Sequence, residues 1–154
     1  MKNIRKIFCP VDFSEPSHAA LGAAVDLADH FSAEIILFHA INQIDPMPAP
    51  TYTLTNHLME HIPEIMQQMT ENAHDALKKL IDNHIAGRVA ARHLVEIGEP
   101  ATSIVKAAQK EQADLIVIAT HGRSGIKGFF FGSVAEKVVR TADCPVLTMK
   151  QHPD

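Results

Sequence analysis

Short apolar runs alternate with helical patterns along this whole chain, and that alternation restricts the fold more than any other feature. The runs are almost continuously apolar, as in Ile35-Ile36-Leu37-Phe38, so both faces of each expected strand should be buried. Strands of this kind, separated by helices, are typical of a parallel sheet with helices on both faces. Strands are expected at residues 4–11, 35–38, 89–97, 114–119 and 146–149.

Helical patterns fill the intervals between these runs. Ser14 is an expected N-cap with Pro16 in the first turn, and the apolar face of that helix reaches Phe31. Further helices are expected at residues 53–84, 101–112 and 133–142. Pro63 is expected to kink or interrupt the longest of them. The proline-rich segment 45–50 should be an exposed loop.

Right-handed connections leave few ways to arrange five such strands. The doubly wound order 3-2-1-4-5 places the first and fourth strands side by side, with the helices that follow them on opposite faces. Ligands of open α/β sheets bind at this switch point, outside the carboxyl ends of the strands. The sequence therefore predicts one domain, residues 1–154, with an α/β, Rossmann-like fold: a doubly wound, five-stranded parallel sheet with helices on both faces.

The segment from Ala119 to Ser133 carries the chemistry expected at that switch point. It contains four glycines and no acidic residue, and it lies between an expected strand and an expected helix. Glycines allow close approach of the backbone, and the N–H groups at a helix amino terminus attract anions. Arg123, Lys127 and Ser133 add cationic or hydroxyl donors. The segment is interpreted as a phosphate-binding loop, and the alternative is a turn that only joins the strand to the helix.

Neither the P-loop motif nor the dinucleotide fingerprint is present. The segment instead resembles the phosphate loop of the universal stress protein family, G-x2-G-x9-G-[ST]. Its four fixed positions are occupied by Ala119, Gly122, Gly132 and Ser133. Nine residues, 123–131, separate Gly122 from Gly132. Ala119 stands where the family has glycine, and its methyl group could crowd a phosphate or a ribose.

The resemblance extends over essentially the whole chain, from the segment PVDFSEPS to the segment GSVAEKVVRTADCPVLTM. It implies that the chain binds ATP or ADP, with Mg²⁺ as an optional companion. In this interpretation Asp12 contacts the nucleoside, the backbone of Ala40 contacts adenine, Gly98 lies near the ribose and the glycine loop holds the phosphates. The implied nucleotide-binding residues are Asp12, Ala40, Gly98, Ala119, Gly122, Arg123, Gly132, Ser133 and Val134.

Each assignment has a structural alternative. Asp12 can form an Asx turn or cap the helix that follows it. Gly98 can be a turn glycine, and Arg123 and Lys127 can be solvated loop charges. No residue is an obvious general base, so we expect a stress-response protein that binds ATP as a ligand or switch, with slow hydrolysis at most. The alternative is an interaction module of the same fold that binds no ATP, and Ala119 is its chief support.

Composition limits the expected partners and cellular location of the protein. The chain is 46% hydrophobic and 21% charged, and its net charge of −4 argues against nucleic-acid or membrane-surface partners. Cys9 and Cys144 are expected to be buried thiols in a reducing compartment. No stretch suits a signal peptide or a membrane span, so a cytoplasmic location is expected.

Ten histidines make the net charge sensitive to pH near neutrality. His57 and His61 have a spacing found in some zinc peptidases, but no clear third ligand accompanies them. A solvated helix face is favoured for this pair, and no metal site is predicted.

The last expected strand lies at an edge of the predicted sheet. It consists of Val146, Leu147, Thr148 and Met149, and the residues after it are too few and too polar to cover it. An exposed apolar edge invites pairing with another chain. The sequence therefore predicts a homodimer in which this strand pairs antiparallel with its mate, as in relatives of the family.

Overall fold

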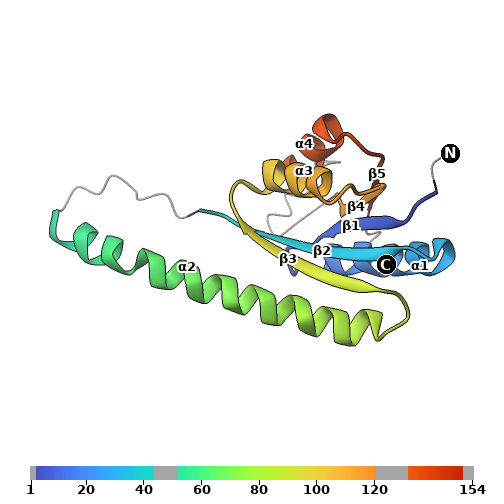
Figure 1. Ribbon diagram of the computed structural model, residues 1–154. Helices are drawn as coiled ribbons and strands as arrows, with labels where there is room; N and C mark the ends of the chain where they lie inside the picture. Colours follow the sequence, from blue (N-terminus) through green and yellow to red (C-terminus); the bar gives the residue numbers. More distant parts are fainter. Residues whose placement is uncertain (1–2, 44–51, 121–131, 151–154) are drawn as a thin grey trace.

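The computed structural model describes residues 3–43, 52–120 and 132–150, and for residues 52–59 it describes the backbone alone. Five parallel strands form one sheet in the order β3-β2-β1-β4-β5, as the sequence predicts (Figure 1). The strands are Lys6–Pro10 (β1), Glu34–Ile41 (β2), Ala91–Ile97 (β3), Leu115–Ala119 (β4) and Val146–Met149 (β5). The helices are Glu15–Phe31 (α1), Tyr52–Leu80 (α2), Pro100–Lys110 (α3) and Ser133–Thr141 (α4).

Helices α1 and α2 cover one face of the sheet, and α3 and α4 cover the other (Figure 1). Successive strand residues alternate between the two faces. Ile7 and Cys9 pack with the side chains of α1, whereas Phe8 packs with those of α3 and α4. The Phe8 and Phe38 rings meet on that second face, with centroids 5.2 Å apart. This two-sided burial explains why the central strands read as continuous apolar runs.

Helix α1 begins at the cap that its sequence indicates. The Ser14 side chain accepts a hydrogen bond from the backbone N–H of Ser17, and Pro16 lies in the first turn of α1. Helix α3 begins at Pro100, with Glu99 as its N-cap. These local signals fix where the chain leaves β1 and β3.

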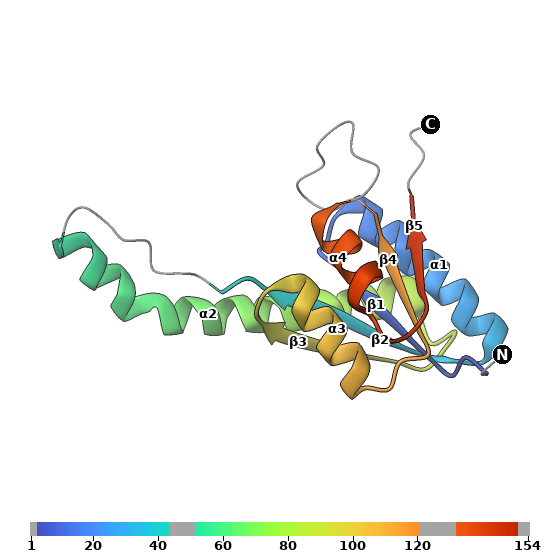
Figure 2. The same ribbon diagram turned by 90° about the horizontal axis from the view of Figure 1, so that it is seen from above.

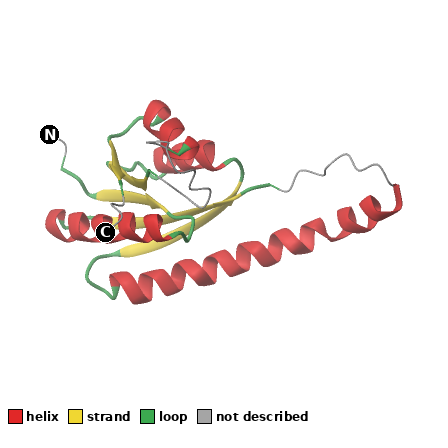
Figure 3. Ribbon diagram, turned by 180° about the vertical axis from the view of Figure 1, so that it is seen from behind, coloured by secondary structure: helices red, strands yellow, loops and turns green. Residues whose placement is uncertain are grey.

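Of the two expectations for Pro63, an interruption of the helix is wrong. Helix α2 continues through Pro63, and Met66, Ala73 and Leu77 further along are buried and hold the helix in place. It ends at Leu80 in a π-helical turn, Ile81–Ile85. Its amino-terminal turns extend beyond the ends of the strands (Figures 2 and 3). The helix is 29 residues long but too polar to cross a membrane, and no other described helix has both the length and the hydropathy.

Both cysteines are free thiols, as the sequence favours. Cys9 is buried beneath α1, whereas Cys144 is half-buried on the opposite face of the sheet. Burial raises the pKa of Cys9 to about 12 and also raises the pKa of Cys144. The two thiols are therefore protonated at neutral pH.

Asp114 fastens the beginning of β1 to the beginning of β4. Its Oδ2 atom accepts hydrogen bonds from the backbone N–H groups of Arg5, at 2.9 Å, and Lys6, at 3.0 Å. The backbone N–H of Asp114 donates in turn to the carbonyl oxygen of Lys6, at 2.9 Å. Segments more than a hundred positions apart are joined by these contacts, which set the register of the two central strands.

Replacing Asp114 with alanine should lower the free energy of unfolding by roughly 1–2 kcal/mol, because two backbone donors lose a charged acceptor. Urea denaturation measures this change. The exposed Asp143, close by at the same end of the sheet, provides the control, and Asp143→Ala should change stability by less than about 0.5 kcal/mol. Equal losses in the two variants would contradict this role of Asp114.

Candidate functional site

The carboxyl ends of β1 and β4 lie side by side at the centre of the sheet. In the register of these strands Ile7 is opposite Leu115 and Phe8 is opposite Ile116, so the segments after Pro10 and after Ile118 emerge next to each other. The helices that follow, α1 and α4, cover opposite faces of the sheet (Figure 2). Open α/β sheets bind ligands where the chain diverges in this way, and this place is called the switch-point crevice below.

Asp12 forms an Asx turn directly after β1. Its Oδ1 atom accepts hydrogen bonds from the backbone N–H of Ser14, at 3.0 Å, and from the Ser14 hydroxyl, at 2.5 Å. The structural alternative considered for Asp12 is thus present, while Ser14 caps the helix. A carboxylate has about four acceptor positions, so this turn does not by itself exhaust the side chain.

Phe13, between these two residues, has a backbone conformation that sequence patterns did not reveal. Its φ is +64°, in the left-handed region that aromatic residues rarely adopt. Its ring packs on His39 with centroids 4.6 Å apart, and Nδ1–H of His39 donates to the carbonyl oxygen of Val11 at 2.8 Å. The end of β2 therefore clamps the turn after β1. Residues held in such conformations cluster at functional sites, which adds Phe13 and His39 to the candidates.

Ala40 and Gly98 lie at the carboxyl ends of the neighbouring strands β2 and β3. Ala40 is half-buried and directly follows His39, and the backbone N–H of Gly98 donates to the carbonyl oxygen of Ile41 at 2.9 Å. A Cβ atom at position 98 would lie 2.6 Å from the Ser103 hydroxyl oxygen. The first turn of α3 thus accounts for glycine at this position without a ligand.

The ends of the glycine-rich segment meet at one hydrogen bond. The backbone N–H of Gly132 donates to the carbonyl oxygen of Thr120 at 2.6 Å, and the N–H of Thr120 donates to Met149 of β5 at 2.9 Å. Residues 121–131, including Gly122, Arg123 and Lys127, lie outside the described residues. The bond closes the base of the segment and places the amino terminus of α4 beside the end of β4.

The amino terminus of α4 differs from those of α1 and α3. Gly132 is its N-cap, and no side chain in the described parts of the chain caps it. Ser133 is exposed and Val134 half-buried in this first turn. The helix thus presents its first backbone donors and the positive end of its dipole toward the crevice, an arrangement that attracts anions.

Glu99, in contrast, occupies the amino terminus of α3. It accepts from the N–H groups of Ala101 and Thr102, and Lys137 of α4 donates to it at 2.9 Å. Hydrogen bonds from Thr102 and Lys137 hold the pKa of Glu99 at about 2, so its carboxylate is ionised at neutral pH. The amino termini of these two helices, both at the carboxyl end of the strands, therefore differ. Glu99 caps that of α3, whereas no described side chain caps that of α4.

Ala119, which replaces a family glycine, lies at the end of β4 and is half-buried. It pairs with Met149 and packs with it against the apolar cluster beneath α1. The methyl group therefore has a place in the core.

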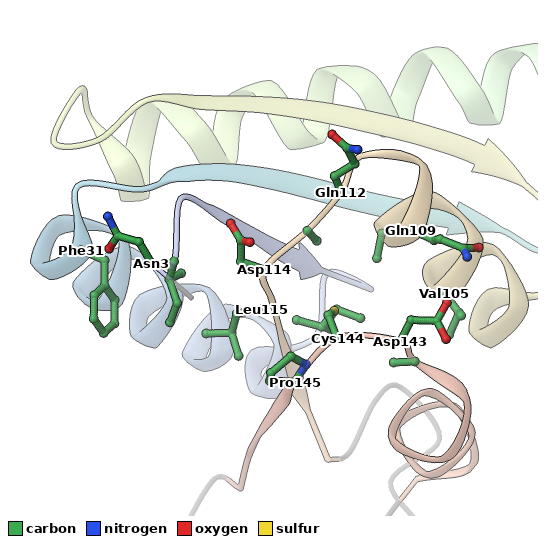
Figure 4. A pocket seen from close by; sticks show the side chains of 15 residues that line it. Asn3, Phe31, Val105, Gln109, Gln112, Asp114, Leu115, Asp143, Cys144 and Pro145 are labelled. Atoms are coloured by element: carbon green, nitrogen blue, oxygen red, sulfur yellow. The ribbon is translucent and has the colours of Figure 1, made fainter. Parts of the chain in front are cut away.

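A cavity of about 800 Å³ lies at the opposite, amino-terminal end of the strands (Figure 4). Its wall is largely apolar and includes Phe31, Leu115, Cys144 and Pro145. None of the predicted site residues lines it. The described residues also contain no group of three or more side chains able to hold a metal ion. His61 is exposed on α2, and the side chain of His57 lies outside the described residues.

Alanine at position 98 should lower the free energy of unfolding by about 1 kcal/mol, since its Cβ would collide with the Ser103 hydroxyl. Removing that hydroxyl should relieve the collision, so Gly98→Ala should cost much less in a Ser103→Ala background. Thermal unfolding of the four proteins of this double-mutant cycle measures the coupling. Additive losses would show that another contact requires the glycine.

Comparison with known proteins places the chain among related sequences. The universal stress protein family matches residues 3–150. Over 147 residues the chain is 35% identical to universal stress protein MJ0531 of Methanocaldococcus jannaschii, covering 96% of this chain and 82% of that protein. The solved structure of MJ0577, from the same organism, has a TM-score of 0.80 and 26% identity and covers 99% of each chain. A universal stress protein in complex with cAMP has a TM-score of 0.64 and 22% identity, covering 98% of this chain and 100% of that chain.

Proposed function

We propose, because this chain belongs to the universal stress protein family, that its switch-point crevice binds an adenine nucleotide, ATP or ADP. Binding would act as a regulatory signal in the stress response, and turnover is not required by the proposal. The observation that carries it is the amino terminus of α4, which no described side chain caps and which lies at the end of β4. The cAMP bound to a protein of the same fold supports an adenine ligand.

Each predicted residue has a role in this proposal. The N–H groups of Ser133 and Val134 bind phosphate oxygens, and Gly132 lets the phosphates approach the backbone. Asp12 accepts hydrogen bonds from the nucleoside. Ala40 offers its backbone to adenine from the end of β2. Gly98 borders the ribose, and Ala119 borders the base of the loop. The remaining phosphate contacts are assigned to Gly122 and Arg123.

Phe13 and His39 extend the proposed adenine contact. Their rings are paired, and in the sequence Phe13 directly follows Asp12 and His39 directly precedes Ala40, the two residues assigned to the nucleoside. An aromatic surface held in a fixed orientation suits a planar base. Mg²⁺ would neutralise part of a triphosphate, and the proposal assigns it no protein ligand.

Valine at Gly132 should raise the dissociation constant for ATP about tenfold or more, because its branched side chain blocks close approach of the phosphates. The backbone at this position has φ −71° and ψ 152°, which valine readily adopts, so the fold should persist. Isothermal titration of nucleotide-stripped protein measures the constant.

Gly22→Val provides the matched control. Gly22 lies on α1, and an added Cβ would meet no atom within 4 Å. Its affinity for ATP should stay within about twofold of the unmodified protein. Unchanged affinity in folded Gly132→Val would exclude this phosphate site, whereas absence of ATP binding by the unmodified protein would favour an interaction module without nucleotide.

We also propose that the protein forms a two-fold dimer through β5. This strand is an edge of the sheet, and the side chains of Leu147 and of Val139 on α4 are 37% and 45% exposed. The carbonyl oxygens of Pro145 and Met149 accept hydrogen bonds from Ile116 and Thr120. Backbone groups alternate along a strand, so Leu147 also faces β4, whereas those of Val146 and Thr148 face outward. A second copy can pair with these outward groups.

Thr148→Pro should convert the dimer to a monomer, because it removes an outward N–H without removing a bond to β4. Proline at Leu147 would instead damage the sheet itself. Thr148→Val keeps the N–H and should remain dimeric. Sedimentation equilibrium of both variants at micromolar concentration decides the matter, and a monomeric unmodified protein would rule out the proposed dimer.

A further inference from the structure

Two pairs of imidazole rings join the end of α2 to the rest of the molecule. His74 of α2 and His93 of β3 lie 3.1 Å apart, measured between Nδ1 and Nε2. His84, in the π-helical turn after α2, packs on His18 of α1 with ring centroids 5.6 Å apart. No residue of either pair belongs to the proposed nucleotide site. Four of the ten histidines thus lie where one long helix meets the sheet and its neighbouring helix.

The His74–His93 contact requires that at least one ring be neutral. A hydrogen bond between two imidazoles needs one nitrogen that carries a proton and one that does not. When both rings are protonated, two donors and two positive charges face each other. Burial lowers the pKa of His93, and the charges of His74 and Lys78 lower it further. The contact therefore favours the state that holds fewer protons.

The His18–His84 contact joins the π-helical turn to α1. The Nε2 atom of His18 is buried and has no hydrogen-bond partner among the described residues.

The surrounding charges do not offset the preference of the His74–His93 contact for fewer protons. Lys78, one turn from His74, is a third positive charge near the first pair. On β3, Arg92 points to the opposite face of the sheet and is paired with Glu34 and Glu111. Arg88, after the π-helical turn, is paired with Asp26 and Asp29 of α1. The remaining charged side chains on adjacent turns are Glu15 of α1, Glu71, Asp75 and Lys79 of α2, and Asp82 of the π-helical turn.

We propose that the contact between His74 and His93 is proton-sensitive: it holds α2 on the sheet at neutral pH and weakens on acidification. When α2 separates locally, His93 leaves the surroundings that lower its affinity for protons. The opened state therefore binds more protons than the docked state, and acid shifts the equilibrium toward opening. Leu77 and Leu80 remain buried in the docked helix, so acid raises the population of the opened state without unfolding the protein.

Native-state hydrogen exchange tests this proposal, with measurements at about pH 7.5 and about pH 5.5, on either side of the ordinary histidine value. Protection factors, corrected for intrinsic exchange, give the opening equilibrium of each segment. Each extra proton bound on opening gives about a tenfold change per pH unit, so residues 66–85 should lose about tenfold more protection than α3 on acidification. Equal losses in the two segments of the unmodified protein would overturn the proposal.

Variants assign the effect to the His74–His93 contact. His74→Gln/His93→Gln should remove most of the excess acid sensitivity of α2. His61→Gln, at an exposed histidine on the same helix, should leave it unchanged. Full acid sensitivity in folded His74→Gln/His93→Gln, or its loss in His61→Gln, would contradict a role for this pair.

Discussion

The parallel pairing of β1 with β4 is the interaction on which the rest of the structure depends. These strands are distant in sequence, and the Asp114 carboxylate fixes their register by binding two backbone donors at the start of β1. Every chain segment beyond their carboxyl ends inherits its position from this pairing. Because α1 and α4 leave toward opposite faces, the pairing also creates the crevice between them.

The helix amino termini that lie near the crevice differ in how they are capped. Ser14 caps α1 and Glu99 caps α3, so the first donors of those helices bind the chain's own oxygens. Helix α4 starts at Gly132, which brings no side chain of its own. The hydrogen bond from Gly132 to Thr120 then places this terminus beside β4. In the proposed function, an anionic ligand supplies the acceptor that no described side chain provides at α4, and this difference from α1 and α3 would favour phosphate.

The sequence predicted the sheet well because its signals are local and its core is simple. Continuous apolar runs can be buried only between two helical layers, and caps such as Ser14 mark helix starts within a few residues. The contacts of the site are less predictable because they join distant segments. The left-handed turn at Phe13 depends on His39, and the glycine at position 98 on Ser103. The π-helical turn after Leu80 leaves no pattern in the sequence either. For Asp12 the sequence indicated both a nucleoside contact and an Asx turn, and the Asx turn that it forms does not exclude a ligand contact.

The central claim is that an adenine nucleotide binds where β1 and β4 end, and not in the apolar cavity at the other end of the sheet. Backbone amide NMR of nucleotide-stripped protein during titration with ATP tests it directly. The account predicts saturable shifts at residues 11–14, 39–41, 98–100, 119–120 and 132–135. The cavity residues Phe31, Gln112, Cys144 and Pro145 would be reported by their own or adjacent amides, which should not move. Shifts confined to that cavity, or no shifts at millimolar ATP, would contradict the account.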